Sequence, residues 1–306
     1  MAKSLALLTV ATASLCQGFA PTSPTTRQTA LFSYLDSLNG AVAAQPSYQT
    51  SSAPPAATTE TSGSTGFCHA PLDYFAFDKL AGKGPRATFD WGTPEDFSRK
   101  LADDGVFRAG SWYCTTGGWP SPNGKGATEI FYVLSGHGML GDEDGEQHYF
   151  GPGDTVIIPK GHTGRWDVNT DIHKLWSVNS HSKVEESGPI VRTVVSNYMD
   201  SAPENMVDTS SCDPLYGSTG CVTSASSTFY DVGPTQVGYW TADRGSFEVE
   251  CGARQWFVVM EGVMFVTDSD GTSKRCAPGD TVMLPAGWSG YVDVVEPVRK
   301  VFTVAR

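Results

Sequence analysis

Few residues of this 306-residue chain have the type and spacing that chemistry requires. Glu129, His162 and Trp166 offer a carboxylate, an imidazole and an indole, and together they could form a small metal or ligand site. Glu248 and Glu250 alternate along a predicted strand, so their carboxylates share one face and could bind a hard cation through oxygen. The alternatives are structural: His162 on an exposed loop, and the two glutamates on a solvated strand face.

No motif in the sequence supplies a complete catalytic apparatus. The chain contains no Gly-x-Ser-x-Gly, no phosphate-binding loop, no dinucleotide fingerprint and no Cys-x-x-Cys pair. All six histidines precede residue 182, so the rest of the chain offers no imidazole. We therefore predict no catalytic residue and no cofactor, and we leave open whether some catalysis is retained.

A fifty-residue segment occurs twice, 126 positions apart and without a gap. Glu129–Val178 and Gln255–Val304 agree at about 18 of 50 positions, mostly Gly, Pro and Asp, which indicates one folding unit present twice. Within each copy, runs rich in Val, Ile, Phe and Tyr alternate with Gly, Pro and Asp clusters at roughly ten-residue spacing. This pattern predicts an all-β fold, with the best helix candidate at Thr93–Leu101 and an extra strand at Ile190–Val195.

Two motifs in the repeat resemble the cupin superfamily. One is a Glu followed, after six residues, by a Gly; the other is Gly-x5-Pro-x-Gly. They are matched by Glu129 and Gly136, by Gly153, Pro159 and Gly161, and in the second copy by Gly279, Pro285 and Gly287. Residues 286–300 look most like the ureidoglycine aminohydrolase-like branch. The resemblance implies a bicupin, with two tandem β-barrels of the jelly-roll type in one chain.

The family's imidazole metal ligands are absent from both copies. Metal-dependent cupins use a His-x-His pair, the Glu and a later His, and the later position holds Gly164 or Gly290 here. In the second copy Gln255 replaces the Glu. This loss favours a non-catalytic protein over the alternative, a cupin hydrolase or isomerase acting on a small polar metabolite, or a small-ligand-binding protein using the first barrel.

Two similar barrels with sheet edges could assemble into oligomers or a lattice. Trp119 and Trp288 have no aromatic counterpart in the other copy, so we predict them at an interface. The layout is also similar to that of pyrenoid shell proteins of complex-plastid algae, which implies a scaffold supporting carbon fixation. Its partners would then be copies of itself and a stromal protein.

The beginning of the sequence predicts targeting to the plastid stroma. Residues 1–18 read as a signal peptide, and the segment that starts at Phe19 is rich in hydroxyls and free of acids, as in transit segments. Plain secretion is the alternative. Farther on, Tyr34, Leu35 and Leu38 form an apolar island that is either a docking peptide or leftover transit sequence.

A formal net charge of −12 argues against nucleic acid and anionic membranes as partners, and no later apolar stretch is long enough to span a bilayer. The predicted organisation is a signal peptide (1–18), a transit segment (19–33), a disordered linker (34–66), a first cupin-like domain (67–180), a connection (181–228) and a second cupin-like domain (229–306).

Overall fold

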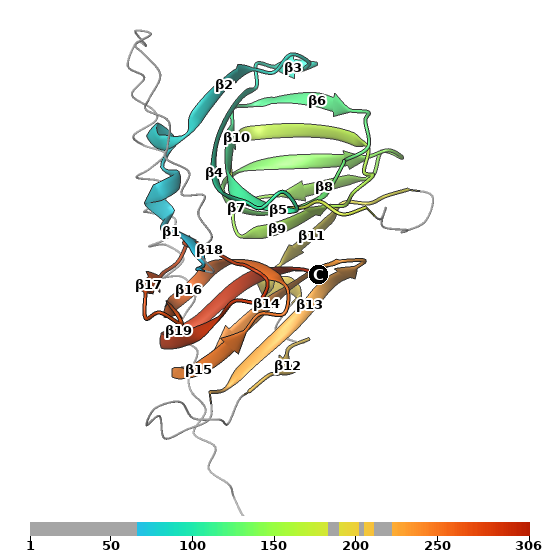
Figure 1. Cartoon of the computed structure of the whole chain (residues 1–306). Coiled ribbons are helices and arrows are strands. Elements are labelled where there is room, and N and C mark those ends of the chain that lie inside the picture. Colours follow the sequence, from blue (N-terminus) through green and yellow to red (C-terminus); the bar gives the residue numbers. More distant parts are fainter. Residues whose placement is uncertain (1–65, 183–189, 202–204, 211–221) are drawn as a thin grey trace, which may run out of the picture.

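The computed structural model describes residues 66–182, 190–201, 205–210 and 222–306. This part of the chain is almost entirely β, and its strands form two antiparallel sheets that curl into two stacked barrels (Figure 1). The predicted all-β class with two tandem barrels is confirmed. The presequence and the island at Tyr34, Leu35 and Leu38 lie outside the described residues.

The first barrel is a ten-stranded sheet with the main order β11-β9-β7-β10-β5-β4-β2, to which β3, β6 and β8 attach. Its strands are β2 (Ala81–Pro85), β3 (Trp91–Gly92), β4 (Glu95–Asp103), β5 (Phe107–Cys114), β6 (Gly117–Ser121), β7 (Thr128–Asp142), β8 (Gln147–Phe150), β9 (Asp154–Ile158), β10 (Gly164–Asn179) and β11 (Val194–Asn197).

The second barrel is a nine-stranded sheet with the main order β1-β18-β16-β19-β14-β13-β12, joined by β15 and β17. Its strands are β1 (Cys68–Ala70), β12 (Val207–Asp208), β13 (Ser224–Val232), β14 (Thr235–Ala242), β15 (Gly245–Glu250), β16 (Arg254–Asp268), β17 (Ser273–Cys276), β18 (Thr281–Leu284) and β19 (Ser289–Ala305). Three short helical turns complete the described structure: η1 (Leu72–Phe75), η2 (Phe77–Lys79) and α2 (Tyr198–Ser201).

The two barrels exchange their outermost strands. β1 precedes the first barrel but pairs with β18 of the second, with Cys68 opposite Met283. β11 precedes the second barrel but pairs with β9 of the first, with Val194 opposite Ile157. Both registers differ by 126 positions, so the repeat extends back to these strands. The strand predicted at Ile190–Val195 is therefore confirmed in part, as β11.

Long strands bend in the middle and so serve both faces of each barrel. β7 pairs with β10 along its length, with register shifts between Val168 and Lys174, and β16 pairs with β19 in the same way. Gly136 lies at the bend with φ +80°, and a Cβ there would come within 2.1 Å of the Asp171 carbonyl oxygen. Gly262 has the same role beside Pro297. The close approach of backbones explains why both copies carry Gly at this position.

The apolar core has three parts. One lies inside each barrel, and the third lies between the barrels, where Tyr113 and Tyr132 from the first are in one cluster with Tyr239 and Trp256 from the second. Because this third cluster contains β1 residue Ala70, the exchanged strand joins both halves.

The helix expected at Thr93–Leu101 is wrong, because most of that segment is strand β4. β4 lies between β2 and β5 and hydrogen-bonds to both. The local start signal of Thr93 and Pro94 is weak compared with a full ladder of cross-strand hydrogen bonds. No helix in the described part of the chain has the length and apolar character needed to cross a membrane.

Candidate functional site: the interior of the two barrels

Each barrel places one lysine at the same internal position. Lys174 on β10 and Lys300 on β19 are 126 residues apart, and each ammonium nitrogen lies over aromatic rings. The distances to the ring centroids are 4.6 Å for Trp112 and 3.8 Å for Phe131 in the first barrel, and 4.7 Å for Trp240 and 4.1 Å for Phe257 in the second. The cation–π contacts are thus equivalent. The surroundings of the two lysines are otherwise different.

In the first barrel the lysine is neutralised by a carboxylate. Lys174 Nζ donates to Glu129 Oε1 over 2.8 Å, and Lys125 pairs with the other carboxylate oxygen. Burial alone would raise the pKa of the Glu129 carboxyl, but the two ammonium groups outweigh it and hold that pKa well below its usual range. Burial lowers the pKa of Lys174 to about 8, although Glu129 opposes that shift. This network is a satisfied, buried ion pair.

Large side chains fill the space around that pair. Trp119 and Trp166 stack with their ring planes 16° apart, and Phe150 packs edge-on against Trp166. Arg86 lies over the Trp119 ring at 3.8 Å and forms an ion pair with Asp96 at 3.0 Å. The interior of the first barrel is therefore closely packed.

In the second barrel the equivalent lysine has no carboxylate. Gln255 occupies the position of Glu129, and among the described residues no hydrogen bond or ion pair joins Lys300 Nζ. Burial lowers the pKa of Lys300 to about 8, since the ammonium has lost water without gaining a carboxylate. Cys251 and Cys276 act on it weakly in the opposite direction.

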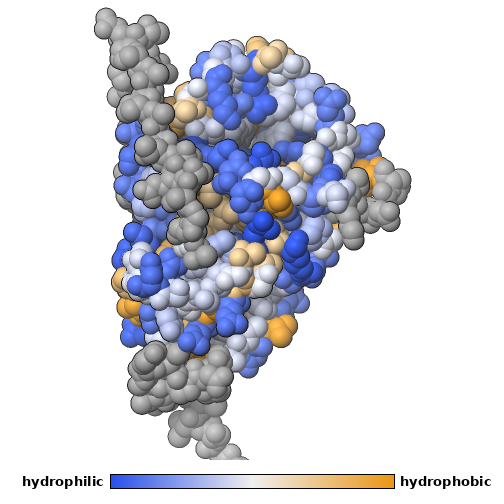
Figure 2. All heavy atoms as spheres, in the orientation of Figure 1, coloured by the Kyte–Doolittle hydropathy of each residue, from blue (hydrophilic) through white to orange (hydrophobic). Residues whose placement is uncertain are grey.

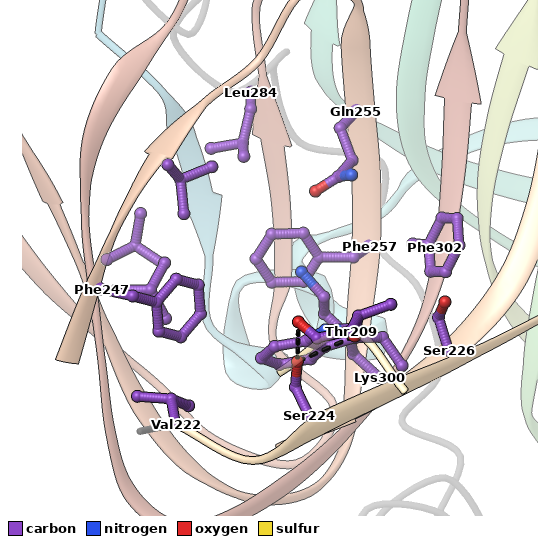
Figure 3. A pocket seen from close by; sticks show the side chains of 14 residues that line it. Thr209, Val222, Ser224, Ser226, Phe247, Gln255, Phe257, Leu284, Lys300 and Phe302 are labelled. Atoms are coloured by element: carbon purple, nitrogen blue, oxygen red, sulfur yellow. Dashed lines mark hydrogen bonds between the residues drawn. The ribbon is translucent and has the colours of Figure 1, made fainter. Parts of the chain in front are cut away.

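The second barrel also holds a chamber of ≈ 300 Å³, into which Lys300 and Gln255 project (Figure 3). Its volume follows from smaller side chains: Val292 stands where Trp166 is in the first barrel, and Phe247 stands where Trp119 is. The remaining lining residues are Thr209, Val222, Ser224, Ser226, Trp240, Val249, Phe257, Val266, Leu284 and Phe302. The walls are thus mainly apolar, with one cation and a few neutral polar groups.

The hydroxyl groups of the chamber lie on one wall. Thr209 Oγ1 and Ser224 Oγ are 2.8 Å apart, and Ser224 Oγ also donates to the Thr209 carbonyl oxygen over 2.9 Å (Figure 3). Thr209 directly follows β12 and Ser224 opens β13, and both line the chamber that contains Lys300.

His162 does not join Glu129, contrary to the sequence prediction. Its side chain is buried and its Nε2 lies 2.9 Å from Asp142 Oδ1 and 3.1 Å from Thr193 Oγ1. In the second barrel Trp288 occupies the same position and donates from Nε1 to Asp268 over 2.5 Å. Because both barrels use this position to anchor the loop to an aspartate, His162 is a structural residue and not an exposed loop residue.

The interface predicted at Trp119 and Trp288 is wrong as well. Both side chains are buried, with 5% and 2% of their surface exposed, and both belong to the internal cores of their barrels. Trp166 lies where it was expected, near Glu129, since both contact Lys174. The strand register also gives Trp119 an aromatic counterpart that the sequence comparison missed, Phe247.

The glutamate pair of the second copy faces solvent. Glu248 and Glu250 are exposed on β15, while the alternating residues Phe247 and Val249 line the chamber. The carboxylates therefore lie on the solvated outer face of the strand, which is the structural alternative given for them.

One group of metal-ligating side chains gathers in the described part of the chain, at Asp142, Glu146 and His148. Arg192 already forms an ion pair with Glu146, and it reaches Asp142 at 3.6 Å. His148 Nε2 lies 2.8 Å from the second oxygen of Asp142. The ligand atoms of this group are thus already engaged by one another and by Arg192.

Comparison with known proteins agrees with the fold. The profile of the EutQ-like cupin domain matches residues 101–176 and again residues 231–302. Both barrels are cupin domains. The chain is therefore a bicupin, as the repeat and the Gly-x5-Pro-x-Gly motifs predicted. No curated protein matches it.

Three solved structures illustrate the likeness. A protein of unknown function from Pseudomonas syringae pv. tomato has a TM-score of 0.59 at 17% identity, over 78% of this chain and 99% of that one. A protein from Pseudomonas aeruginosa, described as a glyoxylate induced protein, has a TM-score of 0.55 at 15% identity, over 86% of this chain and 97% of that one. Protein Ylba from E. coli has a TM-score of 0.52 at 13% identity, over 79% of this chain and 91% of that one. At these identities the likeness concerns the fold alone.

Sequence reasoning missed the lysines. Lys174 and Lys300 are among the identical positions of the repeat, and Glu129 against Gln255 is one of its differences. Together these two facts could have indicated the site, because the lysine is present in both copies whereas the glutamate that pairs with it is present only in the first. What the sequence alone did not supply was that positions 45 residues apart meet inside the barrel.

Proposed function

We propose that the second barrel binds a small organic anion with an apolar body. The observation that supports this is Lys300, whose ammonium group projects into a chamber of ≈ 300 Å³ without the carboxylate that neutralises Lys174 in the first barrel. A ligand carboxylate in that position would restore the missing ion pair. The apolar walls would take up the rest of the ligand.

The charge distribution supports an anion rather than a cation. Lys300 is the one charged residue among the described residues that line the chamber, and the glutamates of β15 point away from it. Charge-assisted hydrogen bonds are about twice as strong as neutral ones, and they are stronger still away from water. The ligand therefore gains most of its specificity from the carboxylate and most of its affinity from the buried apolar part.

The proposed binding can be measured with phenyllactate, which joins a carboxylate to an aromatic body, against its uncharged amide. Titration is followed by calorimetry and by tryptophan fluorescence, because Trp240 lines the chamber. We expect saturable binding of phenyllactate that is at least about tenfold tighter than binding of the amide.

The repeat offers a matched pair of control variants. Gln255→Glu recreates the carboxylate of the first barrel and should abolish binding by pairing with Lys300. Glu129→Gln makes the opposite exchange in the first barrel, outside the chamber, and should leave binding unchanged. If phenyllactate binds Gln255→Glu as tightly as the natural protein, the proposal is wrong.

A self-assembling scaffold is the second candidate, and the exposed edge of the second sheet favours it. Val207 on β12, the last strand of the sheet order, is 67% exposed. On the face shown in Figure 2 most residues are hydrophilic, and hydrophobic ones occur singly or in small groups. Contacts between copies would therefore be strand edges rather than a broad apolar surface.

Particle size tests this second candidate. Residues 67–306 should form particles that grow with concentration and with salt, because salt screens repulsion between copies of an acidic chain. Val207→Lys should reduce their size without lowering stability. A monomer under all conditions would exclude the scaffold. Residence in the plastid, a pyrenoid role and membership of the ureidoglycine aminohydrolase-like branch are parts of the proposal that rest on the sequence.

A further inference from the structure

We infer that Lys300 is a covalent site for carbonyl compounds: its amine condenses with the carbonyl carbon of a 2-keto acid or aldehyde held in the second barrel, forming an imine. This inference rests on the proposed function, because the ligand occupies the same chamber. It adds two points to the proposed function: the ligand has a carbonyl group next to its carboxylate, and the protein forms a covalent bond to that carbonyl carbon.

The setting of Lys300 is that of a nucleophilic amine. The nitrogen lies 4.1 Å from the ring centroid of Phe257 and 4.7 Å from that of Trp240, and among the described residues no acceptor holds its protons. An amine reacts only when it is neutral, and lysines in apolar pockets are activated because burial disfavours the charged form. The pKa of Lys300, lowered to about 8 by burial, leaves roughly a tenth of the amine neutral at pH 7.

The nearby thiols do not compete for the carbonyl group. Burial raises the pKa of Cys276 to about 12, and burial also raises the pKa of Cys251. Both therefore remain protonated at neutral pH, and a protonated thiol is a poor nucleophile. The lysine is the reactive group of this barrel.

The step balances without an oxidant or a reductant. The nitrogen lone pair of Lys300 attacks the carbonyl carbon; the nitrogen gives up one proton and the carbonyl oxygen takes one up, which gives a carbinolamine. The hydroxyl takes up a second proton and leaves as water, and the nitrogen gives up its remaining proton as the C=N bond forms. Thr209 and Ser224 line the same chamber and are hydrogen-bonded to each other, so their hydroxyls can relay these protons.

Lys174 is an internal control for the same chemistry. It has the same aromatic contacts, but Glu129 accepts its proton at 2.8 Å and Trp166 lies 4.5 Å away in a packed interior. Burial lowers the pKa of both lysines to about 8, so the difference between them is one of contact and space: the Glu129 carboxylate accepts a hydrogen bond from Lys174, and the stacked tryptophans occupy the space that a ligand needs. We therefore expect only the second barrel to react.

The test uses phenylpyruvate, the keto acid that corresponds to phenyllactate, with cyanoborohydride to reduce any imine. The intact mass should rise by one keto acid less one oxygen atom, and peptide mapping should place the modification on Lys300. Excess phenyllactate should protect the site. The labelling rate should rise about tenfold from pH 7 to pH 8.5 and then level off, whereas a surface lysine keeps rising toward pH 10.

Two variants separate this inference from the proposed function. Lys300→Arg keeps the positive charge but has no amine that can form an imine, so it should bind phenyllactate and lose at least about nine-tenths of the labelling. Gln255→Glu, which should abolish phenyllactate binding by pairing with Lys300, should abolish the labelling as well, and it serves as the control in which both are lost.

Three results are informative. If phenyllactate binds but Lys300 is labelled no faster than exposed lysines, the covalent step is wrong and the anion site stands. If neither compound binds, both proposals are wrong. Labelling of Lys174 at the same rate as Lys300 would refute the reasoning from the missing carboxylate.

Discussion

The same substitution in the two barrels should have opposite effects on stability. Lys300→Met removes a half-buried ammonium that has no counter-ion, whereas Lys174→Met removes the partner of the Glu129 carboxylate inside the first barrel. Methionine matches lysine in length and flexibility. The two variants therefore differ mainly in whether the ammonium that is removed had a carboxylate partner.

The magnitude for Lys300 follows from its pKa, which burial lowers from 10.5 to about 8. At about 1.36 kcal/mol per pKa unit, holding the charged form in the folded state costs about 3 kcal/mol below pH 8. The chamber admits water, so we expect Lys300→Met to stabilise the protein by about 2 kcal/mol at pH 7. Lys174→Met should destabilise it by about 3 kcal/mol, with Lys125 left to pair with the carboxylate.

The dependence on pH has a definite sign. The folded-state pKa of Lys300 is below the unfolded one, so the unfolded chain binds the proton more tightly and the stability of the natural protein rises between pH 8 and pH 10.5. The advantage of Lys300→Met should therefore shrink over that range. Urea unfolding at pH 7 and at pH 9.5, followed by tryptophan fluorescence, measures both effects. A loss of stability in Lys300→Met equal to that in Lys174→Met would refute the reasoning.

Three further predictions follow from other parts of the molecule. Burial lowers the pKa of His173 from 6.5 to about 4. The contribution of the neutral imidazole to stability is therefore complete above pH 6.5 and should be lost as the pH falls through 4. The natural protein should lose stability between pH 7 and pH 4, and in His173→Gln that loss should be smaller by about 2 kcal/mol. Ala70→Asp puts an unpaired carboxylate into the core shared by both barrels and should lower Tm by at least about 5 °C, unlike Ala81→Asp at an exposed site. A fluorescent fusion of residues 1–66 should enter the plastid, and Phe19→Ala should divert it; secretion of both forms would contradict the targeting prediction.

Sequence by itself determined the all-β class, the tandem organisation and the loss of the family's imidazole ligands. These follow from local properties: period-two patterns make strands, and the ungapped register makes two copies of one unit. Gly136 and Gly262 belong to this group too, since only Gly fits where two backbones approach so closely. The exchange of β1 and β11 was not predicted, because a strand of three or four residues does not indicate by its own sequence which neighbour it pairs with.

Only the tertiary structure decided which side chains meet and how much space is left between them. Glu129 pairs with Lys174 and not with His162, because the barrel brings positions 45 residues apart to one interior point. Val292 in place of Trp166 looks like an ordinary apolar substitution in sequence, yet at the centre of a barrel it leaves space for a ligand. Burial, charge pairing and cavity volume each depend on residues that are far apart in the sequence and meet only in the fold. For that reason the chamber around Lys300 could be found only in the folded molecule.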